Sequence, residues 1–192
     1  MRRTGLVAGV LVLLAAFAYG EAPAASAASK TGSIEFGTIN SVARASNGDT
    51  VLINGSGTFS LQPKSVSGSS PLIEAAFGAV PRTFTHRDAR GNVIATGTWE
   101  PTEVLSYRSF GPATAAQSAF FGGLPAGSEG GKLMIKVALS VGSVHVHDGI
   151  LTIVCELGQP PKNSVETTLL LVQGTPFNFR QVVSGDNIFI RE

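Results

Sequence analysis

Three histidines are the residues of this sequence best suited to bind a metal ion. His145 and His147 are two positions apart in an expected strand, so their side chains point to the same side of it, and His86 is the only other histidine. Two imidazoles on one strand face are a common beginning of a zinc or copper site. A hairpin turn at either Asp148-Gly149 or Gly142-Ser143 places the valine between them on the core face. The pattern therefore favours two solvated histidines, and a zinc or copper site completed by His86 is the alternative.

Trp99, Glu100 and Glu103 are the candidates for binding an organic ligand such as a glycan. A tryptophan can stack on a sugar ring. Two carboxyl groups serve glycoside hydrolysis when they lie roughly 5 to 9 Å apart across a cleft. Closeness in sequence does not create a cleft, and Trp99 shares a strand face with apolar residues. The pattern favours a core tryptophan with two solvated carboxylates, and a ligand-binding trio is the alternative.

Cys155 is the only cysteine, so the chain forms no internal disulfide. It lies on the apolar face of an expected strand and has no serine, histidine or acidic motif near it. A buried thiol without a cationic neighbour is inert. The sequence also contains neither Gly-x-Ser-x-Gly nor His-Glu-x-x-His. It therefore predicts no catalytic residue.

Composition and periodicity predict an all-β protein. Hydrophobic residues make up 43% of the chain and charged residues 14%, which excludes a disordered chain. Apolar residues alternate with others from Leu133 to Val141, which is typical of a half-buried antiparallel strand. Strands are expected at 33–43, 50–53, 57–62, 82–87, 92–99, 103–110, 132–140, 144–147, 150–157, 166–172, 177–184 and 187–191.

Turn residues divide these strands into hairpins. Tight turns are expected at Asn54-Gly55, Arg90-Gly91-Asn92 and Asp148-Gly149, and a last hairpin across Gly185-Asp186. The segment 71–79 is expected to be a short helix or an apolar loop, and the segment 113–119 contains alanine and serine. Either segment could cover an open end of the fold. We expect a single-domain antiparallel β-barrel or β-sandwich of about eight to ten strands, with a barrel around a small apolar cavity preferred.

The first 28 residues have the layout of a cleaved signal peptide. Arg2 and Arg3 precede an apolar run, and small residues follow at Ala25-Ser26-Ala27. Residues 29–192 would then be a secreted domain, exported by either the general or the twin-arginine route. Removal of the leader leaves 12 basic and 12 acidic residues. A neutral domain of this kind has no broad attraction to nucleic acid or to an anionic membrane.

Short glycine-containing segments recur in a characteristic order between Gly48 and the C-terminus. They are Gly55-Ser56-Gly57-Thr58-Phe59, Thr83-Phe84-Thr85-His86, Gly97-Thr98-Trp99, Gly130-Gly131, and Leu151 to Gly158 followed by Pro160-Pro161. In this order they resemble a loosely defined set of small secreted β-rich proteins of bacteria and filamentous fungi. The resemblance implies a secreted β-rich domain and carries no site. The segment 68–81 departs from it by being longer and more apolar.

Two functions remain open from the sequence. The first is a non-catalytic extracellular module that binds a small apolar ligand or a glycan, because a barrel interior suits such a ligand. The second is a secreted enzyme, either dependent on a metal at His86, His145 and His147 or built on a barrel like those of allene oxide cyclases and dirigent proteins. The sequence does not identify the ligand, the partner or the oligomeric state.

Overall fold

The computed structural model describes residues 32–192, and the expected signal peptide, residues 1–28, lies outside them. The described part contains nine strands and two short helices. In chain order they are β1 (Ile34–Ala45), β2 (Thr50–Leu61), β3 (Lys64–Ser67), α1 (Pro71–Phe77), β4 (Thr83–Arg87), β5 (Val93–Pro112), α2 (Ala115–Phe120), β6 (Ser128–Val141), β7 (Val144–Cys155), β8 (Thr167–Val172) and β9 (Asn178–Arg191). Neither helix of this part is long and apolar enough to cross a membrane.

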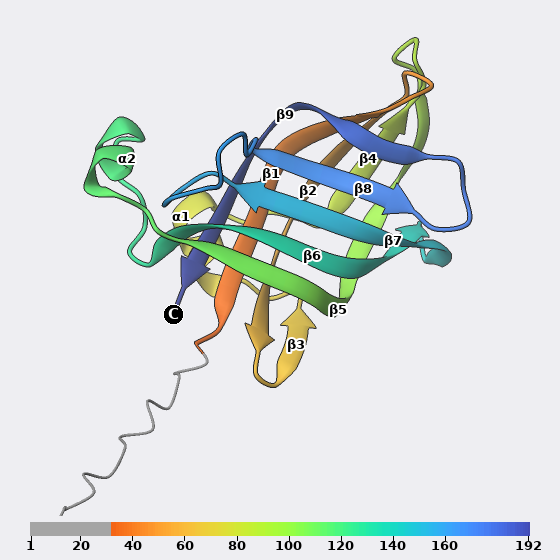
Figure 1. Ribbon diagram of the computed structural model, residues 1–192. Coiled ribbons are helices and arrows are strands. Elements are labelled where there is room, and N and C mark those ends of the chain that lie inside the picture. Colours follow the sequence, from red (N-terminus) through yellow and green to blue (C-terminus); the bar gives the residue numbers. More distant parts are fainter. Residues whose placement is uncertain (1–31) are drawn as a thin grey trace, which may run out of the picture. The chain divides into compact units, whose positions relative to one another are not determined.

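Eight of the described strands form a closed ring of antiparallel pairs (Figure 1). The order is β1-β9-β8-β7-β6-β5-β4-β2, the pairing of β1 with β2 closes the ring, and β3 extends β2 outside it. The expected all-β antiparallel fold is therefore confirmed, in the form of a barrel. The shortest pairing in the ring is that between β8 and β9, which share only the partner pairs Leu170–Phe179 and Leu171–Asn178. Beyond them β9 leaves β8 and pairs with β6 at Glu129.

Alternating side chains fill the barrel interior. Leu133, Ile135, Val137 and Leu139 of β6 are each at most 4% exposed, as their period of two predicts. Trp99 is 2% exposed, and its ring stacks on Phe36 with the ring centroids 6.5 Å apart; the two rings belong to one apolar cluster. The interior is thus a packed core along most of its length.

Several expected turns lie inside continuous strands instead. Asn54-Gly55 is part of β2, Asp148-Gly149 is part of β7 and Gly185-Asp186 is part of β9, whereas Arg90-Gly91-Asn92 does connect two strands. Gly55 has a φ of 156°, and a Cβ there would lie 2.2 Å from the Trp99 ring. This glycine therefore makes room for an aromatic ring and does not reverse the chain. The twelve expected strands merge into eight because the barrel continues pairing through such irregular positions, and β3 is a ninth strand that was not expected.

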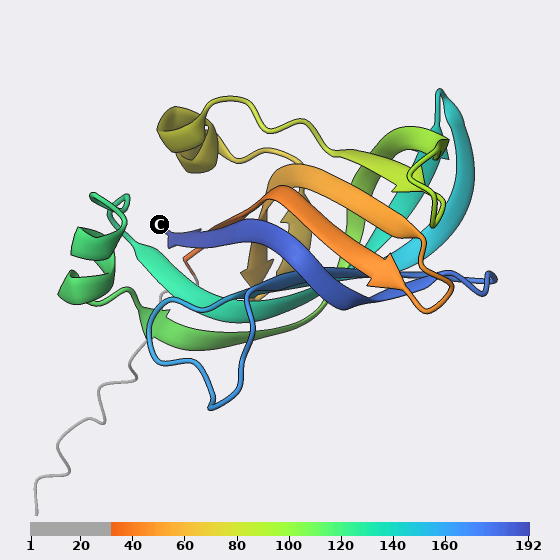
Figure 2. The same ribbon diagram turned by 90° about the horizontal axis from the view of Figure 1, so that it is seen from above.

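Both helices lie at the same end of the barrel, with the end of β9 between them in the view (Figure 2). Helix α1 begins at Pro71, whose fixed φ suits the first helical position, and its Ile73 is fully buried against Ile188 and Ile190. Helix α2 is set by a capping box in which Thr114 accepts a hydrogen bond from the backbone N–H of Gln117. The helical alternative for 71–79 is thereby met, whereas α2 is a helix that the sequence did not specifically predict, and none of its residues is buried.

Candidate ligand-binding pocket

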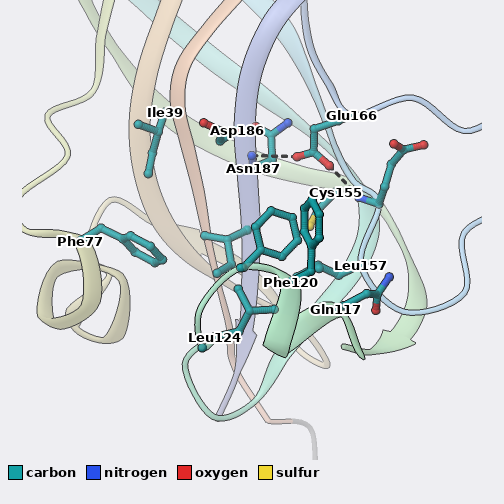
Figure 3. Close-up of a pocket in the computed structure, with 14 residues that line it drawn as sticks. Ile39, Phe77, Gln117, Phe120, Leu124, Cys155, Leu157, Glu166, Asp186 and Asn187 are labelled. Atoms are coloured by element: carbon teal, nitrogen blue, oxygen red, sulfur yellow. Dashed lines mark hydrogen bonds between the residues drawn. The ribbon is translucent and has the colours of Figure 1, made fainter. Parts of the chain in front are cut away.

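A pocket of about 670 Å³ opens at the helical end of the barrel, between α1, α2 and the ends of β7 and β9 (Figure 3). We call it the end pocket. Its walls are mainly apolar, and its large apolar side chains are Ile39, Phe77, Phe120, Phe121, Leu124, Leu157 and Ile188. The polar side chains in its lining are Gln117, Glu156, Glu166, Asp186 and Asn187. Ligand sites of proteins commonly have this size and this mixture of an apolar wall with few polar groups.

Glu166 connects β9 to the end of β7 at the point where β9 is no longer paired with β8. Its Oε1 accepts a hydrogen bond of 2.7 Å from the backbone N–H of Asn187, and its Oε2 accepts one of 2.7 Å from the backbone N–H of Glu156 (Figure 3). The carboxyl group thereby satisfies two N–H groups that lack a strand partner at this point of the ring. Both hydrogen bonds come from the backbone, so the carboxyl group is held in one position at the pocket wall.

The charge of Glu166 has no cationic partner in the pocket lining. Among the described residues that form this lining there is no lysine, arginine or histidine. Burial raises the pKa of Glu166 from 4.5 to about 7, against the opposing effect of the two backbone hydrogen bonds. Removal from water disfavours the ionised form of a carboxyl group, which explains the direction of this shift. Glu166 consequently changes its charge near neutral pH.

A buried polar network lies beside Glu166 and fixes the floor of the pocket. The Asn187 amide donates to the carbonyl of Val154 at 3.0 Å, and its Oδ1 accepts from the Thr168 hydroxyl at 2.7 Å. Thr38 joins the network through its hydroxyl, 2.7 Å from that of Thr168. These bonds connect β1, β7, β8 and β9 where the ladder between β8 and β9 is missing. The polar wall of the pocket is therefore rigid.

Another part of the pocket lining is aromatic and exposed to solvent. Phe120 is 84% exposed and Phe121 is 59% exposed, and their rings meet edge to face with centroids 5.1 Å apart. The segment carrying them is tied to the chain after β7, because Gln117 Oε1 accepts a hydrogen bond of 3.0 Å from the backbone N–H of Gly158. The two rings therefore stand beside the pocket on an anchored helix.

Cys155 lines the same pocket and is 1% exposed. Burial raises the pKa of its thiol to about 12, and the negative charge of Glu166 acts in the same direction. A thiol with so high a pKa is almost entirely protonated at neutral pH and is a poor nucleophile. The structure thus confirms the burial of Cys155 that was expected from the sequence.

The three histidines lie away from the end pocket. His86 and His147 line a second cavity of about 240 Å³, which we call the His86 cavity, at the barrel end opposite the helices. His145 is exposed, and its Nε2 lies 3.0 Å from Asp148 Oδ1. Within residues 32–192 no three His, Cys, Asp or Glu side chains are grouped so as to hold a metal ion. The structure therefore does not bring His86, His145 and His147 together as a metal site.

The expected facing of the β7 strand was wrong. The hairpin turn is at Gly142-Ser143, with Val141 paired to Val144, and β7 continues through Asp148-Gly149. A shift in register opposite Leu139 and Ser140 follows, and Val146, which was expected in the core, is 40% exposed. His147 pairs with Leu139 and reaches the rim of the His86 cavity.

His86 is paired with a buried acidic residue. Its Nε2 lies 3.0 Å from Asp49 Oδ2, and the two side chains are only 14% and 9% exposed. Phe177 and Phe179 contact the imidazole edge-on, each with its ring centroid 5.2 Å away. The pair joins β4 to the turn between β1 and β2, and His86 lines a mainly apolar cavity.

The structure does not unite Trp99, Glu100 and Glu103 in a binding site. Trp99 is in the core, where its Nε1 donates a hydrogen bond of 2.8 Å to the carbonyl of Asn54. Glu100 is exposed and pairs with Arg82 at 3.0 Å, and Glu103 is exposed and pairs with Lys136 at 2.6 Å. Each carboxylate therefore has its own surface cation, and the tryptophan offers no face to a sugar.

Sequence reasoning missed Glu166. It stands at the start of an expected strand, where a charged residue is normally solvated. The sequence did contain one signal. Glu166 lies an even number of residues before Thr168, Leu170 and Val172, so it belongs to the same face of the strand, and those three residues are all buried. A charge in phase with a core face indicates either a burial partner or a binding role.

No model of a known protein family matches this chain. No curated protein and no solved structure matches it either. Any function of this chain must therefore be inferred from its own geometry, above all from that of the end pocket.

Proposed function

We propose that the protein is exported and acts outside the cell as a non-catalytic binding protein for a small, mainly apolar ligand, which it holds in the end pocket. The observation that carries this proposal is the pocket itself, a volume of about 670 Å³ with three phenylalanines in its lining. Its volume lies in the range, roughly 300 to 1,000 Å³, that small-molecule sites occupy. The export rests on the signal-peptide layout of the first 28 residues.

The exposed phenylalanines supply a driving force for binding. Phe120 and Phe121 are the most exposed aromatic rings of this end, at 84% and 59%. A ligand that covers about 100 Å² of each ring would gain roughly 2 kcal/mol per ring from burial of apolar surface. An apolar ligand obtains this energy, whereas a glycan lacks a stacking tryptophan because Trp99 is buried. The apolar ligand is thus the favoured form of the proposal.

The experiment is a titration with the neutral, environment-sensitive dye N-phenylnaphthylamine. Wild-type protein should bind it with increased fluorescence, and the double variant Phe120→Ala, Phe121→Ala should bind at least tenfold more weakly. The matched control is Val93→Ala, Ile94→Ala, which removes two similarly exposed apolar side chains, 51% and 56% exposed, at the other end of the barrel. Equal dye binding by the wild type and the phenylalanine variant would refute the proposal.

An enzyme is the second candidate, and the observation favouring it is the His86–Asp49 pair in the His86 cavity. A carboxylate that holds one imidazole nitrogen leaves the other free to act as a general base. For ester hydrolysis, the imidazole would take a proton from the attacking water and return it to the leaving alcohol. Release of nitrophenol from p-nitrophenyl acetate should then be at least tenfold slower in His86→Gln than in wild type. Equal rates would exclude this hydrolytic role.

A further inference from the structure

The charged side chains in the lining of the end pocket are all acidic. They are Glu156, Glu166 and Asp186, and the described residues of the lining include neither a lysine nor an arginine nor a histidine. Building on the proposed function, we infer that the natural ligand is an organic cation, an amine that carries an apolar or aromatic body. The amine would lie against Glu166 and the body against the phenylalanines.

The Glu166 carboxyl group is already in place to receive an ammonium group. Each of its oxygens accepts one backbone N–H, from Asn187 and from Glu156, and a carboxylate oxygen can accept a further hydrogen bond. Figure 3 draws Glu166, Phe120 and Phe77 on the walls of the same pocket. Because the carboxyl group is held by the backbone, ligand binding does not have to order it first.

The aromatic wall also suits a cation. Positive charge is attracted to the face of an aromatic ring within about 6 Å of its centroid. Phe120 and Phe121 meet at an interplanar angle of 90°, so their faces point in different directions. An amine whose charged group lies at Glu166 can therefore place its apolar body against these rings.

The same lining disfavours anions. A fatty acid would bring its carboxylate toward three acidic side chains and find no basic residue among the described residues of the lining. Like charges at a binding site reduce affinity and exclude such partners. The negative charge of the pocket lining thus distinguishes apolar ligands of equal size by the charge that they carry.

Binding of an amine should release a proton. The titratable groups around Glu166 are Cys155 and Glu156 on the β7 side and Asp186 on β9, and none of them carries positive charge. The empty pocket therefore favours protonated Glu166, while an ammonium group favours the carboxylate. Affinity for an amine that stays charged should increase as the pH rises from about 6 to 8.

The experiment compares three ligands of equal chain length, octylammonium, octanol and octanoate, by displacement of N-phenylnaphthylamine. We expect octylammonium to bind about tenfold more tightly than octanol, and octanoate to bind most weakly. Equal affinity for octanol and octylammonium would overturn the cation inference and leave the pocket function intact. Binding of none of the three would overturn both.

Glu166→Gln tests whether the preference for cations arises at this carboxyl group. The variant should lose most of the difference between octylammonium and octanol, and retained octanol binding shows that its pocket is folded. Glu103→Gln is the matched control, because Glu103 is exposed and paired with Lys136. If Glu166→Gln does not fold, the double variant Glu156→Gln, Asp186→Asn keeps Glu166 in place and should weaken octylammonium alone. An unchanged preference in the folded variant would contradict the inference.

Discussion

Glu129 and Glu166 are two glutamates that differ in the partners that surround their carboxyl groups. Glu129 is 5% exposed and accepts two hydrogen bonds from the Arg191 guanidinium, at 2.9 and 2.8 Å. It also accepts one of 2.5 Å from the hydroxyl of Tyr107. Glu166 instead accepts hydrogen bonds from two backbone N–H groups and faces a pocket whose described lining holds no cation. One carboxyl group has its counter-charge within the chain, and the other is left to obtain it from a ligand.

The pKa shifts express this difference. Hydrogen bonding to Glu129 raises the pKa of Arg191, and burial with the same carboxylate raises that of Tyr107 above its usual value of 10.0. Both partners are thus held in their protonated forms, which donate hydrogen bonds to Glu129. At Glu166 burial without a cation acts in favour of the neutral form. The availability of a cation, more than depth, therefore separates a structural carboxylate from one suited to binding.

The largest expected effect is the pH dependence that Glu166 gives to stability. Its pKa is raised from 4.5 to about 7 in the folded state, a difference worth about 3 kcal/mol. The folded protein therefore binds more protons than the unfolded chain between these values. The stabilising contribution is complete below about pH 4.5 and is lost as the pH rises through about 7. Urea unfolding of wild type and Glu166→Gln across this range should show a steeper decrease for wild type, and parallel curves would contradict it.

Removing the internal cation of Glu129 should have the next largest effect. Arg191→Met leaves a buried carboxylate whose remaining side-chain partner is Tyr107. Breaking a fully buried pair costs roughly 3 to 5 kcal/mol, and since the Arg191 side chain is 41% exposed we expect about 2 kcal/mol. Chemical denaturation measures the loss. Arg191→Lys, which keeps the charge without the bidentate geometry, should lose less; an unaltered unfolding midpoint in Arg191→Met would show that Glu129 does not depend on this cation.

A smaller effect is expected where the aromatic wall of the end pocket is anchored. Thr114→Ala removes the side-chain oxygen that caps α2, which costs about 1 kcal/mol of helix stability. Amide hydrogen exchange of Gln117 and Ser118 should become about fivefold faster, while exchange in β6 should not change. Thr114→Ser keeps the capping oxygen and should behave like wild type. Equal exchange in all three proteins would mean that the cap does not hold this wall.

The smallest effect should follow from a carboxylate that water already solvates. Glu103→Gln breaks the pair with Lys136, in which the side chains are 55% and 44% exposed. Exposed pairs of this kind contribute about 0.5 kcal/mol or less, because solvent screens them. The denaturation midpoint should therefore stay within error of wild type. A loss as large as that of Arg191→Met would erase the distinction between exposed and buried carboxylates in this protein.

Local periodicity was sufficient to predict the parts of the fold that depend on one strand at a time. The alternation around Ile135 placed β6 in the core, and the apolar phase of Cys155 predicted its burial. Turn signals were less reliable, because Asn54-Gly55 and Asp148-Gly149 lie within strands. Glycine permits a turn, a bulge or the close approach of a ring equally well. Only the neighbour, such as Trp99 over Gly55, decides among these outcomes.

The sequence by itself determined that this chain forms antiparallel strands and hides its single thiol, because side-chain alternation is a property of each strand alone. The tertiary structure decided where the candidate site is. Glu166 meets the backbone of Asn187, 21 residues later, only because β9 leaves β8 and crosses the end of β7. Its raised pKa depends on burial by these distant segments. Ring closure joins residues far apart in the chain, and no local pattern records which of them will meet.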